Sequence, residues 1–174
     1  MDLGRSALFG VVLGLLGAAI YAHTNAIVLV LFWAAASWLS REPRVPGFLG
    51  WLLAALVYPA MGTHLTVGIF LASQAVPRAA MAGLGWIARP AADSSIPNVT
   101  TPGAILSMAA GIAAAALSGR YALLMFVASL VTVRIVVGLA YKRSGGISST
   151  HLGWTRQILE IAIFLIARLP VVTP

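Results

Sequence analysis

Long apolar segments alternate with short polar ones along nearly the whole chain. Seven of these segments come close to the roughly 20 apolar residues that a membrane-spanning helix needs. They cover residues 6–22, 26–39, 48–62, 65–87, 104–118, 121–140 and 155–171. Only Thr63 and His64 separate the third segment from the fourth, so a count of six spans stays open. The pattern predicts an all-α, polytopic membrane bundle of about seven helices, forming a single transmembrane domain over residues 1–174.

The composition agrees with this pattern. Of the 174 residues, 60% are hydrophobic and 9% are charged, which is typical of a polytopic membrane protein and not of a soluble domain. Several segments are rich in Gly and Ala, and such small faces favour close packing of helices within a bundle. The chain contains no cysteine, which excludes disulfides. The first residues are interpreted as a membrane helix and not as a removed signal peptide.

The net charge of +7 raises the question of a nucleic-acid partner. Nucleic-acid binding requires basic residues gathered on a water-facing surface, whereas here Lys and Arg lie mostly at the ends of apolar runs. With seven spans, one side receives Arg5, Arg41, Arg44, Arg89, Lys142, Arg143 and Arg156, and the other receives Arg120 and Arg168. This bias predicts a cytoplasmic N-terminus and an external C-terminus in a bacterial-type inner membrane. We expect membrane lipid but no nucleic acid as a partner, and a homo-oligomer stays open.

The longest polar stretch is Tyr141–Glu160, and it admits two interpretations. A basic, hydroxyl-bearing loop rich in glycine that runs into a helix is a plausible phosphate cradle, since helix N-termini and free backbone N–H groups favour anions. The alternative is a connector whose charges only set the topology. The segment 41–47 admits the same two interpretations. Arg41, Glu42 and Arg44 form a proline-pinned cluster that could hold a phosphate or a metal–phosphate, or their charges could only set the topology.

Charges inside the spans are functional candidates by default. Arg134 lies about 10 Å from the Tyr141 end of its helix, and Glu160 lies about as deep in the next helix. An ion pair between them is therefore expected, with Arg156–Glu160 as the competing pair. Arg78 has no obvious acidic partner, so an anionic ligand or backbone carbonyls must satisfy it. No combination of nucleophile and base is visible, so we assign no catalytic residue.

The order of these motifs resembles the cobalamin synthase family, adenosylcobinamide-GDP ribazoletransferase. Residues 8–16 are similar to its opening helix, residues 41–50 to its Lys-Asp-Ser-Arg stretch, and residues 76–81 to its Ser-Arg-centred helix. Residues 145–153 resemble its Gly-Gly-x-Thr-Gly-Asp-x-Leu-Gly signature, and Glu160 stands at the place of an acid in the helix that follows.

The resemblance implies an Mg²⁺-dependent membrane transferase of cobalamin biosynthesis. Such an enzyme joins α-ribazole or its phosphate to GDP-activated cobinamide and releases GMP, so a corrinoid and a nucleotide are the implied small-molecule partners. The implied substrate- or phosphate-binding residues are Arg41, Arg44, Arg78, Gly145, Gly146, Ser148, Ser149, Thr150 and Gly153, with Glu42 and Glu160 as metal candidates.

Two departures from the family's pattern keep other functions open. The family's acidic run after the second helix has no counterpart, and Thr150 stands where the signature has its aspartate. Metal-assisted phosphoryl transfer needs carboxylates to hold Mg²⁺ against phosphate oxygens. One alternative is a non-catalytic homologue that binds a corrinoid, a nucleotide or a partner subunit. The other is a small transporter-like membrane protein with Arg78 and Arg134 along a polar path.

Overall fold

The computed structural model describes residues 3–23, 28, 31, 32, 35, 66–92, 94, 96, 98–167 and 169. The arginine–glutamate cluster at 41–44 and the predicted span at 48–62 lie outside these residues, as does most of the predicted span at 26–39. Within the described residues the regular structure is helical, and the single β-contact is an isolated bridge between Pro90 and Ile147.

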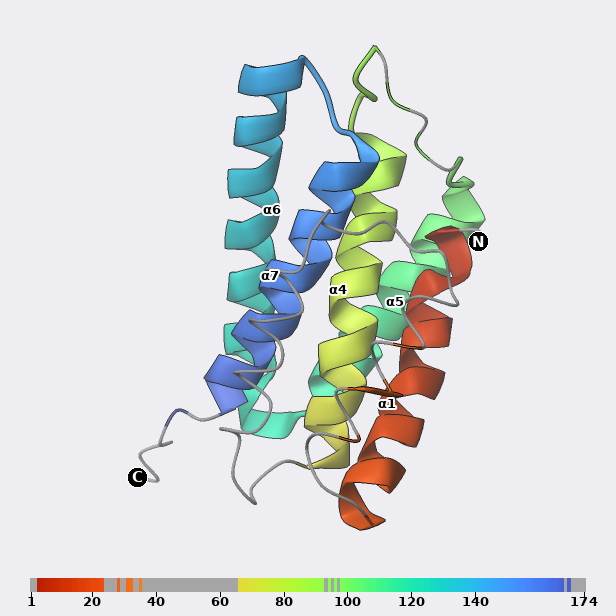
Figure 1. The fold of residues 1–174 in the computed structure, drawn as a ribbon, viewed down its shortest axis with the longest axis vertical. Coiled ribbons are helices and arrows are strands. Elements are labelled where there is room, and N and C mark those ends of the chain that lie inside the picture. Colours follow the sequence, from red (N-terminus) through yellow and green to blue (C-terminus); the bar gives the residue numbers. More distant parts are fainter. Residues whose placement is uncertain are drawn as a thin grey trace.

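Five α-helices and two short 3-10 turns make up the described fold. The helices are α1 (Ser6–His23), α4 (Val67–Ile87), α5 (Thr101–Leu117), α6 (Ala122–Ser144) and α7 (Ser149–Ala167). The 3-10 turns are η1 (Leu3–Arg5) before α1 and η2 (Gly119–Tyr121) between α5 and α6. The four helices from α4 onward lie in alternating directions, as the sequence pattern predicts for successive spans (Figure 1).

Helix α4 is the centre of the bundle. It contacts α1 and α5 on one side and α7 on the other, and α6 packs on α7 (Figure 1). Every residue from Gly68 to Ala79 is buried, including the polar Ser73, Gln74 and Arg78. A helix that is buried on all sides places any polar side chain where it needs a partner within the protein.

Small residues allow the helices around α4 to approach it closely. A Cβ added at Gly14 of α1 would lie 2.7 Å from the Cα of Leu71, and one added at Gly10 would collide with the backbone of Gln74. Gly111 of α5 lies in the same way against Ala79. Close backbone approach of this kind is the usual packing mode of helices in membranes, where small residues form the interface.

Three helical segments among the described residues are long and apolar enough to cross a membrane. They are Ser6–His23, Val67–Ile87 and Gly119–Ser144, while Thr101–Leu117 is a shorter apolar helix. Helix α7 is long enough at 19 residues but carries Arg156 and Glu160. The described helices therefore fit a helical membrane protein with three such segments, and not the seven spans expected from the sequence.

Candidate functional site: a buried polar centre between α4 and α7

Arg78 is the most deeply buried charged side chain among the described residues, with an exposed fraction of 0%. Its Nη1 donates to the backbone oxygen of Gln74 at 2.8 Å and to the Oε1 of the same residue at 2.9 Å. Residues four apart share one face of a helix, so Gln74 lies one turn before Arg78 and directly beside it. The Arg78 guanidinium carbon also lies 5.9 Å from the ring centroid of Phe9 on α1, within the range of a cation–π contact.

Gln74 continues the hydrogen-bond chain to α7. Its Nε2 donates to the Oε1 of Glu160 at 2.7 Å, while its Oε1 accepts from Arg78. The amide is thus used at both ends, which also fixes its orientation, because only the nitrogen end can donate to a carboxylate. The result is a polar chain Arg78–Gln74–Glu160 that connects α4 to α7 through the middle of the bundle; we refer to it as the polar centre.

Hydroxyls of α1 and α5 complete the surroundings of the polar centre. The hydroxyl of Ser6 lies 2.7 Å from the backbone oxygen of Leu3 and 3.3 Å from that of Arg78. The hydroxyl of Ser107 accepts the backbone N–H of Ala7 at 3.3 Å. Both serines are fully buried, so four helices contribute polar groups to the same region.

The energetics of the polar centre indicate a role beyond filling space. Burying a charged group in a low-dielectric interior costs several kcal/mol unless hydrogen bonds and a counter-charge compensate it. A guanidinium and a carboxylate bridged by one amide provide such compensation. An ionisable residue kept inside a membrane bundle at this cost is a functional-site candidate by default.

The structure brings together two residues that the sequence analysis treats separately, Arg78 and Glu160. It does not place Arg134 beside Glu160: Arg134 is exposed on α6, and no ion pair between the two is present within the described part of the chain. The buried face of α6 carries Thr132, Val136 and Ala140, four residues apart. Arg134 lies about 200° around the helix from Thr132, so it points away from α7. Arg156, the competing partner, is buried one turn before Glu160.

Gln74 is the member of the polar centre that sequence analysis missed. The signal was present, since Gln74 is the polar residue one helical turn before Arg78 in an otherwise apolar segment. A search for i, i+4 polar pairs within predicted spans would have found it.

The glycine-rich loop at 145–147 is fixed against the segment that precedes α5. Gly145 ends α6 in the left-handed conformation, with φ of 65°, as the residue after a helix commonly does. Ile147 donates its N–H to Arg89 O at 2.9 Å and accepts from Ala91 N at 2.8 Å. A Cβ on Gly146 would lie 2.7 Å from that backbone, so only glycine fits between the two segments.

Ser148 and His151 interact with each other at the start of helix α7. The Nδ1 of His151 accepts the backbone N–H of Ser148 at 3.2 Å and lies 2.7 Å from the Ser148 hydroxyl. A side chain at the third helical position that accepts the N–H of the capping residue is the arrangement of a capping box. Ser149 is exposed, Thr150 is half-buried and Gly153 is buried. The residues predicted as a phosphate cradle therefore begin a helix, and the part of that prediction concerning phosphate stays a prediction.

The loop and the polar centre lie at different depths. Arg78 is ten residues before Ala88, the residue that ends α4, and Glu160 is eleven residues after the first residue of α7. At 1.5 Å per residue, both lie about 15 Å below the end of the bundle that carries the loop. Of the predicted substrate-binding residues, Arg78 therefore lies apart from Gly145–Gly153, and Arg41 and Arg44 lie outside the described residues.

The end of the bundle that carries the loop is basic; we refer to it as the basic end. The apolar cluster beneath it joins Leu3, Leu84, Val99, Ala140 and Ile147, so the ends of η1, α4 and α6 meet there. In the part of the chain that the structure describes, its exposed cations are Arg5, Arg89, Lys142 and Arg143. Arg120, by contrast, lies in η2 at the opposite end (Figure 1).

The Mg²⁺ implied by the resemblance does not fit the described residues. Glu160 is the one carboxylate among them, and one of its oxygens is held by Gln74. No group of three or more His, Cys, Asp or Glu suitable for a metal is found in the described part of the chain. Mg²⁺ takes oxygen ligands in near-octahedral geometry and is bound through one or two carboxylates together with substrate phosphates. Glu42, the other predicted ligand, lies outside the described residues.

Fold and site together fit the class of helical membrane proteins with a buried ionisable centre. No protein-family model matches the chain, and no curated protein or solved structure matches it. Any narrower assignment therefore depends on the motifs and on the polar centre.

Proposed function

We propose that this protein is a divergent, membrane-embedded relative of the cobalamin synthases. In this proposal it acts on a GDP-activated corrinoid, joining α-ribazole or its phosphate to it and releasing GMP. Arg78 and Glu160, linked through Gln74, form the buried part of its ligand site, and the basic end receives the phosphates.

One observation supports the proposal. The resemblance singles out Arg78 and Glu160 through two unrelated motifs, 82 positions apart in the chain. In the structure the same two residues are joined through one glutamine, by hydrogen bonds of 2.9 and 2.7 Å. The linkage supports treating the two residues as parts of one site.

A second candidate function is binding without transfer, and the state of the acidic residues favours it. The single described carboxylate is engaged by Gln74, and Thr150 occupies the position of the signature's aspartate. A protein of this kind keeps the bundle and the cationic groups that attract a phosphate-bearing corrinoid, nucleotide or partner subunit. Its described residues offer fewer carboxylates than metal-assisted transfer needs.

The orientation in the membrane is part of the proposal. Among the described residues, the basic end carries four exposed cations and the opposite end carries Arg120, so the positive-inside rule favours a cytoplasmic basic end. The N-terminal end of α1 then faces the cytoplasm of a bacterial-type cell and α7 ends at the outer face. In this orientation, nucleotide-activated substrates made in the cytoplasm reach the protein at its basic end.

Turnover and binding measured on the same sample distinguish the two candidates. The purified protein in detergent receives adenosylcobinamide-GDP, α-ribazole and Mg²⁺; GMP release is followed by chromatography and corrinoid binding by absorbance. An established cobalamin synthase serves as the positive control. Transfer is supported if Gln74→Leu abolishes GMP release and the matched Gln157→Leu on α7 retains it. Binding that depends on Gln74 without release supports the second candidate, and neither binding nor release contradicts both.

A further inference from the structure

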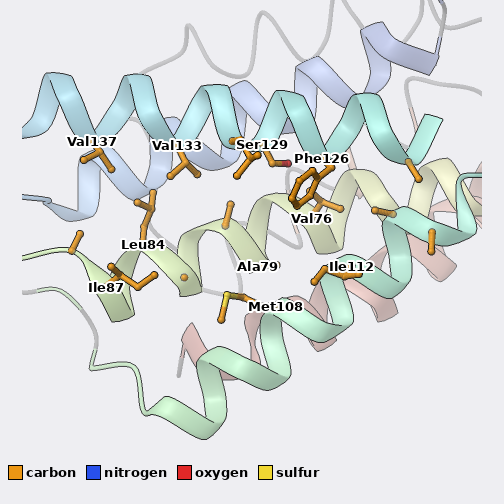
Figure 2. Close-up of a pocket in the computed structure, with 18 of the residues that line it drawn as sticks. Val76, Ala79, Leu84, Ile87, Met108, Ile112, Phe126, Ser129, Val133 and Val137 are labelled. Carbon is orange, nitrogen blue, oxygen red and sulfur yellow. The ribbon is translucent and has the colours of Figure 1, made fainter. Parts of the chain in front are cut away.

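A cavity of about 670 Å³ opens between α5 and α6, with α4 as its floor (Figure 2). The lining from α4 and α5 includes the small residues Ala79, Gly83 and Gly111. In Figure 2, Ala79 and Leu84 of α4 face Ser129 and Val133 of α6 across the cavity. Ser129, a polar residue in the wall, donates its hydroxyl to the backbone oxygen of Met125 on its own helix. The cavity lining is therefore almost wholly apolar. Arg78 is absent from it, so the cavity is separate from the polar centre.

The dimensions of the cavity match one hydrocarbon chain. On α6 the lining extends from Ala122 to Tyr141, which is about 28 Å and close to the roughly 30 Å thickness of the hydrocarbon layer. If a methylene group takes the about 30 Å³ that a water molecule occupies in the liquid, the cavity holds about 20 of them.

The charges at one end of the cavity determine the headgroup. Tyr141 and Ala88 line the cavity at the basic end. The Tyr141 hydroxyl accepts the backbone N–H of Arg89 at 2.9 Å, which brings Arg89 to the cavity mouth. Arg89 and Lys142, the residues that follow these two in the chain, are both exposed. An anionic headgroup is attracted by such a cluster, at about 1 kcal/mol per cation near the membrane surface.

We propose that the cavity binds one chain of an anionic membrane lipid, with the lipid headgroup at Arg89 and Lys142. The bound chain fills the space between α5 and α6 and completes the packing of α4 on that side. The lipid is then a specific structural ligand of the bundle. It makes the stability of the α5–α6 pair depend on lipid charge, and the proposal is independent of any corrinoid chemistry.

Native mass spectrometry with defined lipids tests this proposal. The detergent-solubilised protein is titrated with phosphatidylglycerol or with phosphatidylcholine of the same chains, and the retained lipid is counted. We expect one phosphatidylglycerol per chain and weaker retention of phosphatidylcholine. Gly83→Leu places a side chain in the cavity, because a Cβ at Gly83 has only Met108 nearby, at 3.5 Å. We expect this variant to lower lipid retention about ten-fold, equivalent to about 1.4 kcal/mol.

Two controls make the test specific. Gly138→Leu on α6 places the same side chain where a Cβ meets nothing within 4 Å and outside the cavity lining, and it leaves retention unchanged. Arg89→Ala removes the preference for phosphatidylglycerol, whereas Arg120→Ala at the opposite end keeps it. If Gly83→Leu does not yield folded protein, Ser129→Leu fills the cavity from the opposite wall. Equal retention by the filled and open proteins, absence of a charge preference, or occupation by a second copy seen as a dimer mass would each overturn the proposal.

Discussion

Arg78 determines which polar groups must lie around it. A charge with an exposed fraction of 0% on the central helix has no water to solvate it, so its hydrogen bonds must come from the protein. Gln74 supplies two of them and is itself held by Glu160. The glutamine is therefore hydrogen-bonded to both charged side chains.

Replacing Gln74 by leucine removes the bridging amide while keeping the side chain's approximate volume. The Nη1 of Arg78 loses one acceptor and the carboxylate of Glu160 loses one donor, both in a buried region. We expect a loss of about 2–4 kcal/mol in unfolding free energy, as for other buried charges deprived of a partner. Chemical unfolding of the purified protein in detergent measures this loss.

Gln157 provides the matched control for this substitution. It lies on α7, is half-buried and is not part of the polar centre. Gln157→Leu is expected to change the unfolding free energy by less than about 0.5 kcal/mol, the usual range for surface positions. Similar losses in the two variants would show that Gln74 contributes nothing through its hydrogen bonds.

At the scale of helices, the contacts of α4 depend on small residues at the crossing points. Gly14 of α1 faces the backbone of Phe70 and Leu71, and a Cβ there would lie 2.7 Å from the nearest atom. Gly138 of α6 is also within a membrane-length helix but faces open space. At position 14 glycine is needed because a side chain has no room, whereas position 138 has room for a side chain.

Alanine substitutions distinguish these two roles. Gly14→Ala must push α1 away from α4, and we expect it to lower the unfolding free energy by about 1–3 kcal/mol, as overpacking does. Gly138→Ala should raise it by about 0.5–1 kcal/mol, since alanine loses less conformational entropy than glycine in a helix. The same unfolding measurement in detergent gives both values. A stable Gly14→Ala variant would contradict the close α1–α4 packing.

The helices themselves were largely predictable, but the contacts between them were not. The apolar runs at 6–22, 65–87 and 121–140 correspond to the three candidate spans. Helix α7 begins at Ser149, six residues before the predicted start of the last segment, because the contacts between Ser148 and His151 and the burial of Leu152 stabilise its mostly polar first turn. Hydropathy detects burial but not caps.

The polar centre was predicted in part for a similar reason. The sequence shows that Arg78 and Glu160 are costly to bury, but the depth of a residue does not fix the direction in which it points. The expected pairing of Glu160 with Arg134 rested on depth alone, whereas the rotation of α6 exposes Arg134 and the rotation of α4 directs Gln74 to Glu160. Rotation is set by the packing of neighbouring helices, which a single sequence does not encode locally.

At the scale of the whole molecule, the two ends of the described bundle differ in the number of exposed positive charges. Arg5, Arg89, Lys142 and Arg143 are exposed at the end where η1, α4, α6 and α7 meet, and Arg120 is at the other. The proposed orientation, lipid site and substrate access all depend on this asymmetry. An inverted protein would present its basic end to the outer face.

The natural absence of cysteine makes this orientation directly measurable. Single cysteines replace Lys142 at the basic end or Arg120 at the opposite end, and intact cells are treated with a membrane-impermeant maleimide. We expect labelling of Arg120→Cys in intact cells, and of Lys142→Cys only after the membrane is opened, because the positive-inside rule holds Lys142 in the cytoplasm. The unsubstituted chain is the blank, and total labelling in detergent normalises both variants. The reverse labelling pattern would show that the bundle has the opposite orientation. The basic end, with its proposed phosphate and lipid headgroup contacts, would then lie on the side of the membrane away from cytoplasmic nucleotides.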